Sequence, residues 1–219
     1  MGVVALFVIG LEVLVAIHAA QHRIVARVLL LCLATFVLVY EIVQFAQTRA
    51  MPIAFSTFSY FLFGIAVLLP FRPIKTTAAF CAFVSGAVYL SAFLFYPDRI
   101  YAQQPLESVR IVGFLLHNMM LLGSLLLYGQ CKLEQKDIFY VLGFVVFVAV
   151  YTEVAMHICA SNQINALTLG IVEATLIQEI LPHFVLKWWW YVLWYALVAV
   201  VFWAMWELTC FVNRKLLRQ

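Results

Sequence analysis

Long apolar runs constrain this chain of 219 residues more than any other feature of its sequence. An α-helix rises 1.5 Å per residue, so about 20 apolar residues cross the ~30 Å hydrocarbon core of a bilayer. Runs of that kind cover residues 3–20, 24–46, 52–71, 76–97, 110–129, 138–159 and 188–212. Soluble proteins average about 45–50% apolar and about 25% charged residues, whereas this chain has 67% and 11%. We therefore predict an all-α polytopic transmembrane helical bundle of about seven spans, forming a single domain over residues 1–219.

The basic residues between the runs predict an orientation. If the N-terminus lies outside, the cytoplasmic side holds nine basic residues, namely Arg23, Arg27, Arg72, Lys75, Lys132, Lys136, Arg214, Lys215 and Arg218. The outer side then holds Arg49, Arg99, Arg110 and Lys187. Because cytoplasmic loops carry the excess of Lys and Arg, we expect the N-terminus outside and the C-terminus inside. The expected location is a bacterial plasma membrane, with the protein integral and multi-pass.

One further apolar segment does not fit this pattern of spans. Residues 161–186 include Glu173, Glu179 and the helix-breaking Pro182. An eighth span here would place the basic C-terminus outside, against the charge bias. We expect instead an outer interfacial or re-entrant helix near residues 163–182.

Several polar side chains lie inside the apolar runs. They are Glu41, Ser56, His117, Glu153 and His157. A charge at the bilayer centre costs at least ~2.5–3.5 kcal/mol, so such residues normally face a protein interior, a partner or a water-filled cavity. The expected topology places all five within roughly 12 Å of the outer edge. We predict a polar cavity in the outer half of the bilayer, also lined by Asn118 and, slightly deeper, by Glu12.

Structural explanations of the same residues remain open. Glu153 and His157 stand four positions apart on one helix face and can satisfy each other between helices. His117 can equally be a core histidine packed beside Asn118. The sequence predicts no metal site, no cofactor and no nucleic-acid partner, since it has no basic run and its cysteines are scattered. A haem or metal site through His18, His117, His157 and His183 is an alternative that the predicted topology supports only loosely.

An ordered series of short motifs gives the chain a family resemblance. The series comprises Arg27 to Glu41, Pro52–Ser56, Val84–Ala87 continuing to Pro97-Asp98, Phe114–His117, and Lys187–Tyr191. In this order and spacing, over about residues 24–205, the chain resembles the YwaF-like family of integral membrane proteins. That family carries an arginine and a glutamate on its second helix, a histidine in the middle of a later helix and an aromatic opening to its last span.

The resemblance implies a possible activity. An animal branch of the family is regarded as a phospholipid acyltransferase that uses a membrane-embedded cysteine and histidine. By position, Ser56 stands where that cysteine would be, His117 matches the histidine and Glu41 the glutamate. The chain departs from the family pattern at Ser56, and Ala54 stands where the family often has His or Gln. Serine needs a base to remove its proton, and His117 is the candidate.

Two hypotheses of different classes follow. In the first, the protein is a lipid acyltransferase or transacylase in which Ser56 attacks an ester, His117 takes the proton and Glu41 or Glu153 orients the imidazole. In the second, it is a non-enzymatic carrier of a small solute or lipid, or an accessory subunit of a larger membrane complex. Membrane lipids are the expected partners in both cases, and the second adds a protein partner in the membrane.

Overall fold

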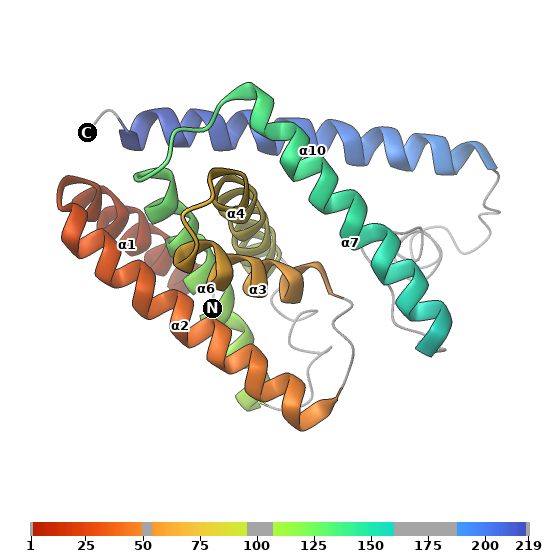
Figure 1. Ribbon diagram of the computed structural model, residues 1–219, viewed down its shortest axis with the longest axis horizontal. Helices are drawn as coiled ribbons and strands as arrows, with labels where there is room; N and C mark the ends of the chain where they lie inside the picture. The colour runs from red at the N-terminus through yellow and green to blue at the C-terminus, as the bar shows by residue number, and fades with distance from the viewer. Residues whose placement is uncertain (1, 50–53, 96–106, 160–187, 218–219) are drawn as a thin grey trace.

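The computed structural model describes residues 2–49, 54–95, 107–159 and 188–217, and these residues are almost entirely helical with no strand among them. The helices are α1 (Gly2–Gln21), α2 (Arg23–Thr48), α3 (Phe55–Leu68), α4 (Arg72–Phe95), α6 (Glu107–Tyr128), the 3-10 turn η1 (Gln135–Asp137), α7 (Ile138–Cys159) and α10 (Trp188–Leu217). Figure 1 shows their arrangement. The prediction of an all-α fold is confirmed for this part of the chain.

Five of these helices contain stretches long and apolar enough to cross a membrane. The stretches are Arg23–Thr48, Arg72–Phe95, Ile111–Tyr128, Gln135–Thr152 and Tyr195–Leu216. Two apolar stretches are shorter: Ala5–Gln21 in α1, and α3 itself. With 14 residues, α3 extends about 21 Å, less than the ~30 Å of a bilayer core. This architecture is that of a multi-pass integral membrane protein. The segment 161–186 lies outside the described residues.

Local signals explain where several helices end. Arg49 ends α2 in the left-handed conformation, with φ 51°, and its N–H donates to the carbonyl of Phe45. This is an αL cap made by a residue other than glycine. Pro70 lies just beyond α3, where it cannot continue a helix, and Pro73 lies in the first turn of α4, where a missing N–H costs nothing.

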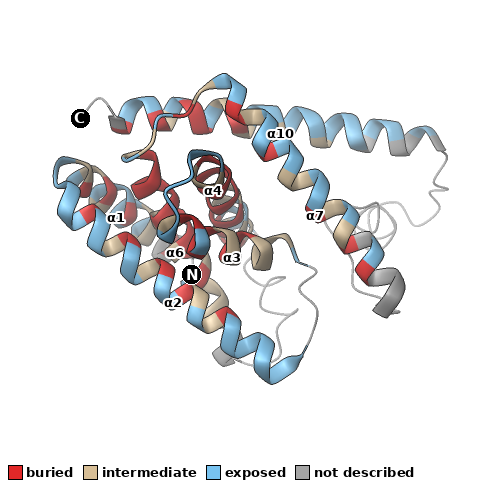
Figure 2. Ribbon diagram, viewed as in Figure 1, coloured by how far each residue is buried: buried red, intermediate tan, exposed pale blue. Residues whose placement is uncertain are grey.

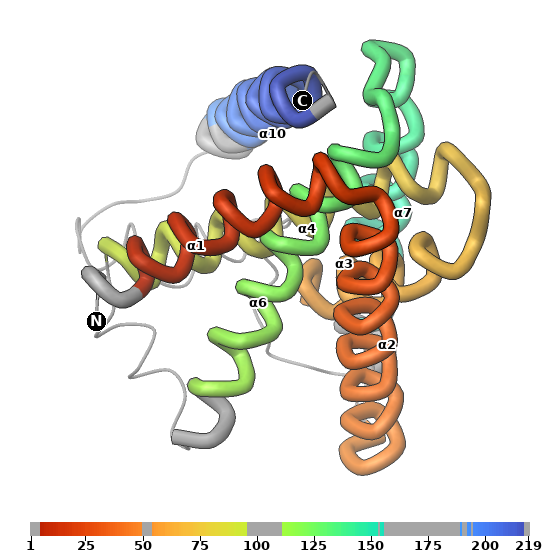
Figure 3. The backbone as a smooth tube through the Cα atoms, turned by 90° about the vertical axis from the view of Figure 1, so that its left-hand side faces the viewer, coloured from red at the N-terminus to blue at the C-terminus, as the bar shows by residue number. Residues whose placement is uncertain are grey.

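The centre of the molecule is the contact between α4 and α6, the helices with the most buried residues in Figure 2. Gly86 permits it, because a Cβ there would stand 2.8 Å from the carbonyl oxygen of His117 and the backbone nitrogen of Leu121. On the other side of α6, the ring of Phe63 from α3 occupies the space next to Gly123. In Figure 3, α1 and α4 run in opposite directions, and both pack against α6.

We term the helix ends that carry Arg23, Arg72 and Arg214 the basic end, and polar contacts join α10 to the α6–α7 connection there. Asn213 of α10 is 1% exposed, and its Nδ2 donates to the carbonyls of Tyr128 and Cys131 at 2.7 Å each. Its Oδ1 accepts from the N–H of Leu133 at 3.0 Å. These bonds satisfy carbonyls that the end of α6 leaves unpaired and fasten the α6–α7 connection to α10.

Helices α7 and α10 present mainly exposed apolar surface, coloured pale blue in Figure 2. Among the large exposed side chains are Phe147 and Val150 of α7, and Val200 and Trp203 of α10. Exposed apolar surface on this scale is expected where the surrounding solvent is lipid rather than water.

Candidate functional site

The candidate site is built around His117, in the middle of α6. The close approach of α4 at Gly86 brings the next turn of that helix over the imidazole. There the Tyr89 ring stacks on His117 with centroids 3.8 Å apart and planes at 14°. From α3, the Tyr60 ring meets the imidazole edge-on, with centroids 5.6 Å apart. Three helices therefore hold the orientation of one histidine.

Hydrogen bonds assign a tautomer to His117. Its Nδ1 lies 2.7 Å from the carbonyl oxygen of Gly113, and a carbonyl can only accept. Nδ1 therefore carries the proton and donates to Gly113, and Nε2 has a free lone pair. The Tyr60 hydroxyl lies 3.0 Å from Nδ1 and 3.2 Å from Nε2. Because Nδ1 already carries a proton, Nε2 is the nitrogen that can accept the hydrogen of this hydroxyl. In this tautomer Nε2 can act as a base towards the Tyr60 hydroxyl.

Ser56 lies one turn before Tyr60, on the same face of α3. The Ser56 hydroxyl lies close enough to the Tyr60 hydroxyl to interact with it. Tyr60 is 4% exposed, whereas Ser56 is only half-buried. A chain of polar groups therefore runs from a partly open serine, through a buried tyrosine, to the histidine. We term Ser56, Tyr60, Tyr89 and His117, together with Glu41, the Tyr60–His117 site.

Glu41 approaches this site from α2. Its residue is 7% exposed, and its carboxyl acts electrostatically on the hydroxyls of Tyr60 and Tyr40. Packing of α2 on α3 sets this approach, since the side chain of Leu38 lies against Gly64 at 3.0 Å from the position of a Cβ. The structure thus brings three predicted catalytic residues to one region, with Tyr60 between Ser56 and His117.

Asn118 and Glu12 are buried elsewhere in the bundle. Asn118 is 6% exposed, and its Nδ2 donates to the carbonyl of Phe114 at 2.6 Å, while its Oδ1 has no partner. Glu12 on α1 is 7% exposed, and its Oε2 has no hydrogen-bond partner. Within the part of the chain that the structure describes, no interaction joins Glu12 to Tyr60 or His117. Both residues remain buried polar groups without an assigned role.

Two other predicted residues cannot be placed in the site. Glu153 and His157 belong to α7, but their side chains lie outside the described residues. Across the described ranges 2–49, 54–95, 107–159 and 188–217, no group of three or more His, Cys, Asp or Glu side chains is placed to hold a metal ion. The rings of His18 and His22 lie 4.9 Å apart at the basic end, on α1 and beside the start of α2.

Sequence reasoning missed Tyr60 and Tyr89. Hydropathy counts a tyrosine with the apolar residues, so neither interrupts its run. A signal was present for each: Tyr60 follows Ser56 by four residues, and Tyr89 follows the close-packing Gly86 by three. Such spacings place both side chains on the same helix face as a residue that matters for the site.

The fold and the site together define a class: an all-helical, multi-pass membrane protein with a buried tyrosine–histidine–carboxylate site. Comparison of the chain with protein-family models, with curated proteins and with solved structures finds no match. The function is therefore argued from the geometry of the site.

Proposed function

We propose that this chain is a seven-span membrane protein, N-terminus outside and C-terminus inside, whose Tyr60–His117 site binds the ester region of a membrane lipid. One observation carries the proposal. A buried imidazole is connected through the Tyr60 hydroxyl to the half-buried Ser56, so the site extends to a partly open edge of the bundle. Around a membrane protein the ambient molecules are lipids, whose ester carbonyls accept hydrogen bonds from hydroxyl donors.

The family resemblance points to the same ligand. Ser56, His117 and Glu41 are the residues that the YwaF-like pattern selects, and Ser56 and Glu41 both act on Tyr60, which donates to His117. We keep membership of that family, and a bacterial plasma membrane as the location, as parts of this proposal.

Lipid cross-linking tests the binding step. Purified protein in lipid nanodiscs is loaded with a phospholipid that carries a photoreactive group near its ester, and the cross-linked peptides are identified by mass spectrometry. We expect enrichment in α3 and α6, and a loss of that enrichment in His117→Phe but not in the exposed control Tyr195→Phe. Equal cross-linking of all lipid-facing helices in both variants would contradict the proposal.

Acyl transfer is a second candidate, favoured by the hydroxyl chain itself. The Ser56 Oγ would attack the ester carbonyl while its proton passes to the Tyr60 oxygen and the Tyr60 proton passes to His117 Nε2. Collapse of the tetrahedral intermediate breaks the ester bond, and the leaving lysolipid oxygen takes the proton back from His117 through Tyr60. The acyl group stays on Ser56 until an acceptor hydroxyl displaces it.

Mass spectrometry distinguishes this reaction from binding alone. With a chain-labelled phospholipid, an acyltransferase carries the labelled acyl group on Ser56 and Ser56→Ala abolishes transfer while lipid cross-linking persists. If the protein binds the phospholipid but neither carries an acyl group on Ser56 nor transfers one, it is a carrier or an accessory subunit. Transfer at an undiminished rate in Ser56→Ala would remove Ser56 from the mechanism.

A further inference from the structure

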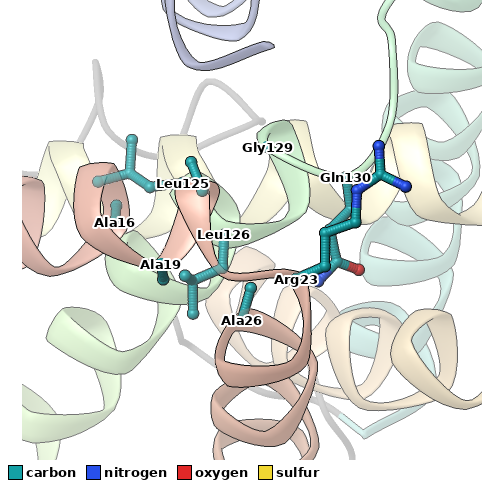
Figure 4. A pocket seen from close by; sticks show the side chains of 9 residues that line it. Ala16, Ala19, Arg23, Ala26, Leu125, Leu126, Gly129 and Gln130 are labelled. Carbon is teal, nitrogen blue, oxygen red and sulfur yellow. The ribbon is translucent and has the colours of Figure 1, made fainter. Parts of the chain in front are cut away.

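A shallow notch opens at the basic end, between α1, α2 and α6, away from the Tyr60–His117 site (Figure 4). Small and apolar side chains line most of it: Ala16, Ala19, Ala20, Ala26, Leu125 and Leu126. Arg23 and Gln130 are the polar side chains that line it, and Figure 4 shows them side by side. The notch therefore combines an apolar floor with a cationic rim.

The charge around this rim has one sign. Between Glu12 and Glu41 the only charged side chains are Arg23 and Arg27. Glu134, the nearest acidic residue after Gln130 in the sequence, is already paired with Arg72 at 3.1 Å and with Lys136 at 2.9 Å. Within the described residues no ion pair joins Arg23 to a carboxylate. The rim is thus complementary to an anion.

The backbone at this position supplies hydrogen-bond donors. Helix α2 begins at Arg23, and His22 before it makes no side-chain capping bond. The first N–H groups of a helix have no intrahelical partner and carry the positive end of its dipole, which favours a negative group. Since α1 ends at Gln21 and α6 at Tyr128, the negative ends of two other helices also lie beside the notch. The attraction for an anion therefore comes from the Arg23 guanidinium and the free N–H groups of α2.

We propose that this notch binds an anionic phospholipid, with the phosphate at Arg23 and the start of α2 and the first part of the lipid body against the alanines. The chain spans a membrane, so an anion that arrives with an apolar tail is available at this end. Basic pockets between membrane helices recognise anionic headgroups in this way. Small side chains on the floor are needed because a larger one would fill the notch.

Binding of a defined lipid tests the proposal. Native mass spectrometry of the detergent-solubilised chain is titrated with phosphatidylglycerol and with phosphatidylcholine carrying the same acyl chains. We expect phosphatidylglycerol to bind about tenfold more tightly than phosphatidylcholine, and Arg23→Gln to remove about fivefold to tenfold of its affinity. The matched control Arg214→Gln removes one exposed basic charge from the same end and should change the affinity less than about twofold.

A second pair of variants tests the floor of the notch. Ala20→Leu fills it from a half-buried position, and Ala204→Leu adds the same bulk at an exposed position on α10. Ala20→Leu should weaken phosphatidylglycerol binding at an unchanged melting temperature, and Ala204→Leu should not. Three results would each overturn the proposal: equal affinity for the two lipids, equal losses in Arg23→Gln and Arg214→Gln, or unchanged binding in Ala20→Leu.

Discussion

At the scale of single residues, the site depends on a hydroxyl that lies between two groups identified from the sequence. Ser56 and His117 are not directly bonded in the structure, because Tyr60 donates to His117 Nε2 and interacts with Ser56. A base that acts through a tyrosine needs the tyrosine hydroxyl rather than the ring. The hydroxyl of Tyr60 is therefore the atom on which both binding and proton transfer depend.

Removing this hydroxyl should destabilise the protein. Tyr60→Phe keeps the ring but leaves Nε2 of His117 without its donor, and an unpaired buried polar atom costs about 1–3 kcal/mol. The free energy of unfolding, measured by denaturant titration in a fixed detergent, should fall by that amount. In the control Tyr195→Phe, at a residue that is 52% exposed, the free energy of unfolding should fall by less than about 0.5 kcal/mol. Equal losses in the two variants would show that the Tyr60–His117 hydrogen bond contributes nothing to the free energy of unfolding.

How far the sequence predicts such residues depends on their chemistry. Glu41, Ser56 and His117 could be found because each is polar within an apolar run. The structure brings them into one region. Tyr60 and Tyr89 could not be found in this way, since their rings fit an apolar helix and only packing reveals their partners. Glu12 was expected to line the same space, but nothing in the sequence shows which neighbouring helices its face meets.

At the scale of elements, the α4–α6 contact sets the geometry of the site. Gly86 lets the backbones approach so closely that Tyr89 covers His117. Two of the three atoms that a Cβ would meet belong to the backbone of α6, and the third is the Cβ of Leu121, so none can move aside as the end of a flexible side chain can. This element pair is therefore sensitive to a single methyl group.

Gly86→Ala should destabilise the fold by about 1–3 kcal/mol, the usual cost of overpacking. The matched control is Gly143→Ala in α7, where a Cβ meets nothing within 4 Å. There alanine should stabilise the helix by up to about 1 kcal/mol, because glycine has the lower helix propensity. Thermal unfolding followed by circular dichroism compares the two variants. A Gly86→Ala protein as stable as the wild type would contradict the close approach.

The connection between α6 and α7 should respond to acid. Lys136 and Arg72 hold the pKa of Glu134 at about 2, below its ordinary 4.5. A lowered pKa in the folded state means that the stabilisation is complete above about pH 4.5 and is lost as the pH falls towards 2. The melting temperature of the wild type should therefore fall more than that of Glu134→Gln over this range. Parallel curves for the two proteins would exclude a contribution from Glu134.

Element boundaries could be predicted from the sequence because the apolar runs, and the polar or proline-containing segments that separate them, coincide with the helices and their connections. The predicted run 138–159 matches α7, and 24–46 differs from α2 by one residue at its start and two at its end. Helix α3 covers Phe55–Leu68, so it begins after the start of the predicted run 52–71 and ends before its end. Near its C-terminal end, Pro70 breaks a helix that hydropathy alone would continue.

At the scale of the whole molecule, topology determines which side of the membrane each site faces. The bias of nine basic residues against four predicts the N-terminus outside and the basic end in the cytoplasm. Fusions of a periplasm-active and a cytoplasm-active reporter to each terminus measure this directly. We expect activity of the first reporter at the N-terminus and of the second at the C-terminus. The same side for both termini would require an even number of spans and would invalidate the predicted count of seven.

The central claim is that the Tyr60–His117 site binds a lipid, and a structure of the protein in lipid nanodiscs tests it most directly. The account predicts an elongated density whose polar end lies about 3 Å from the hydroxyl of Ser56 or Tyr60 and whose tail follows α3 into the bilayer. Side chains of α2, α3, α4 and α6 closing over Ser56, with lipid density only around α7 and α10, would contradict it.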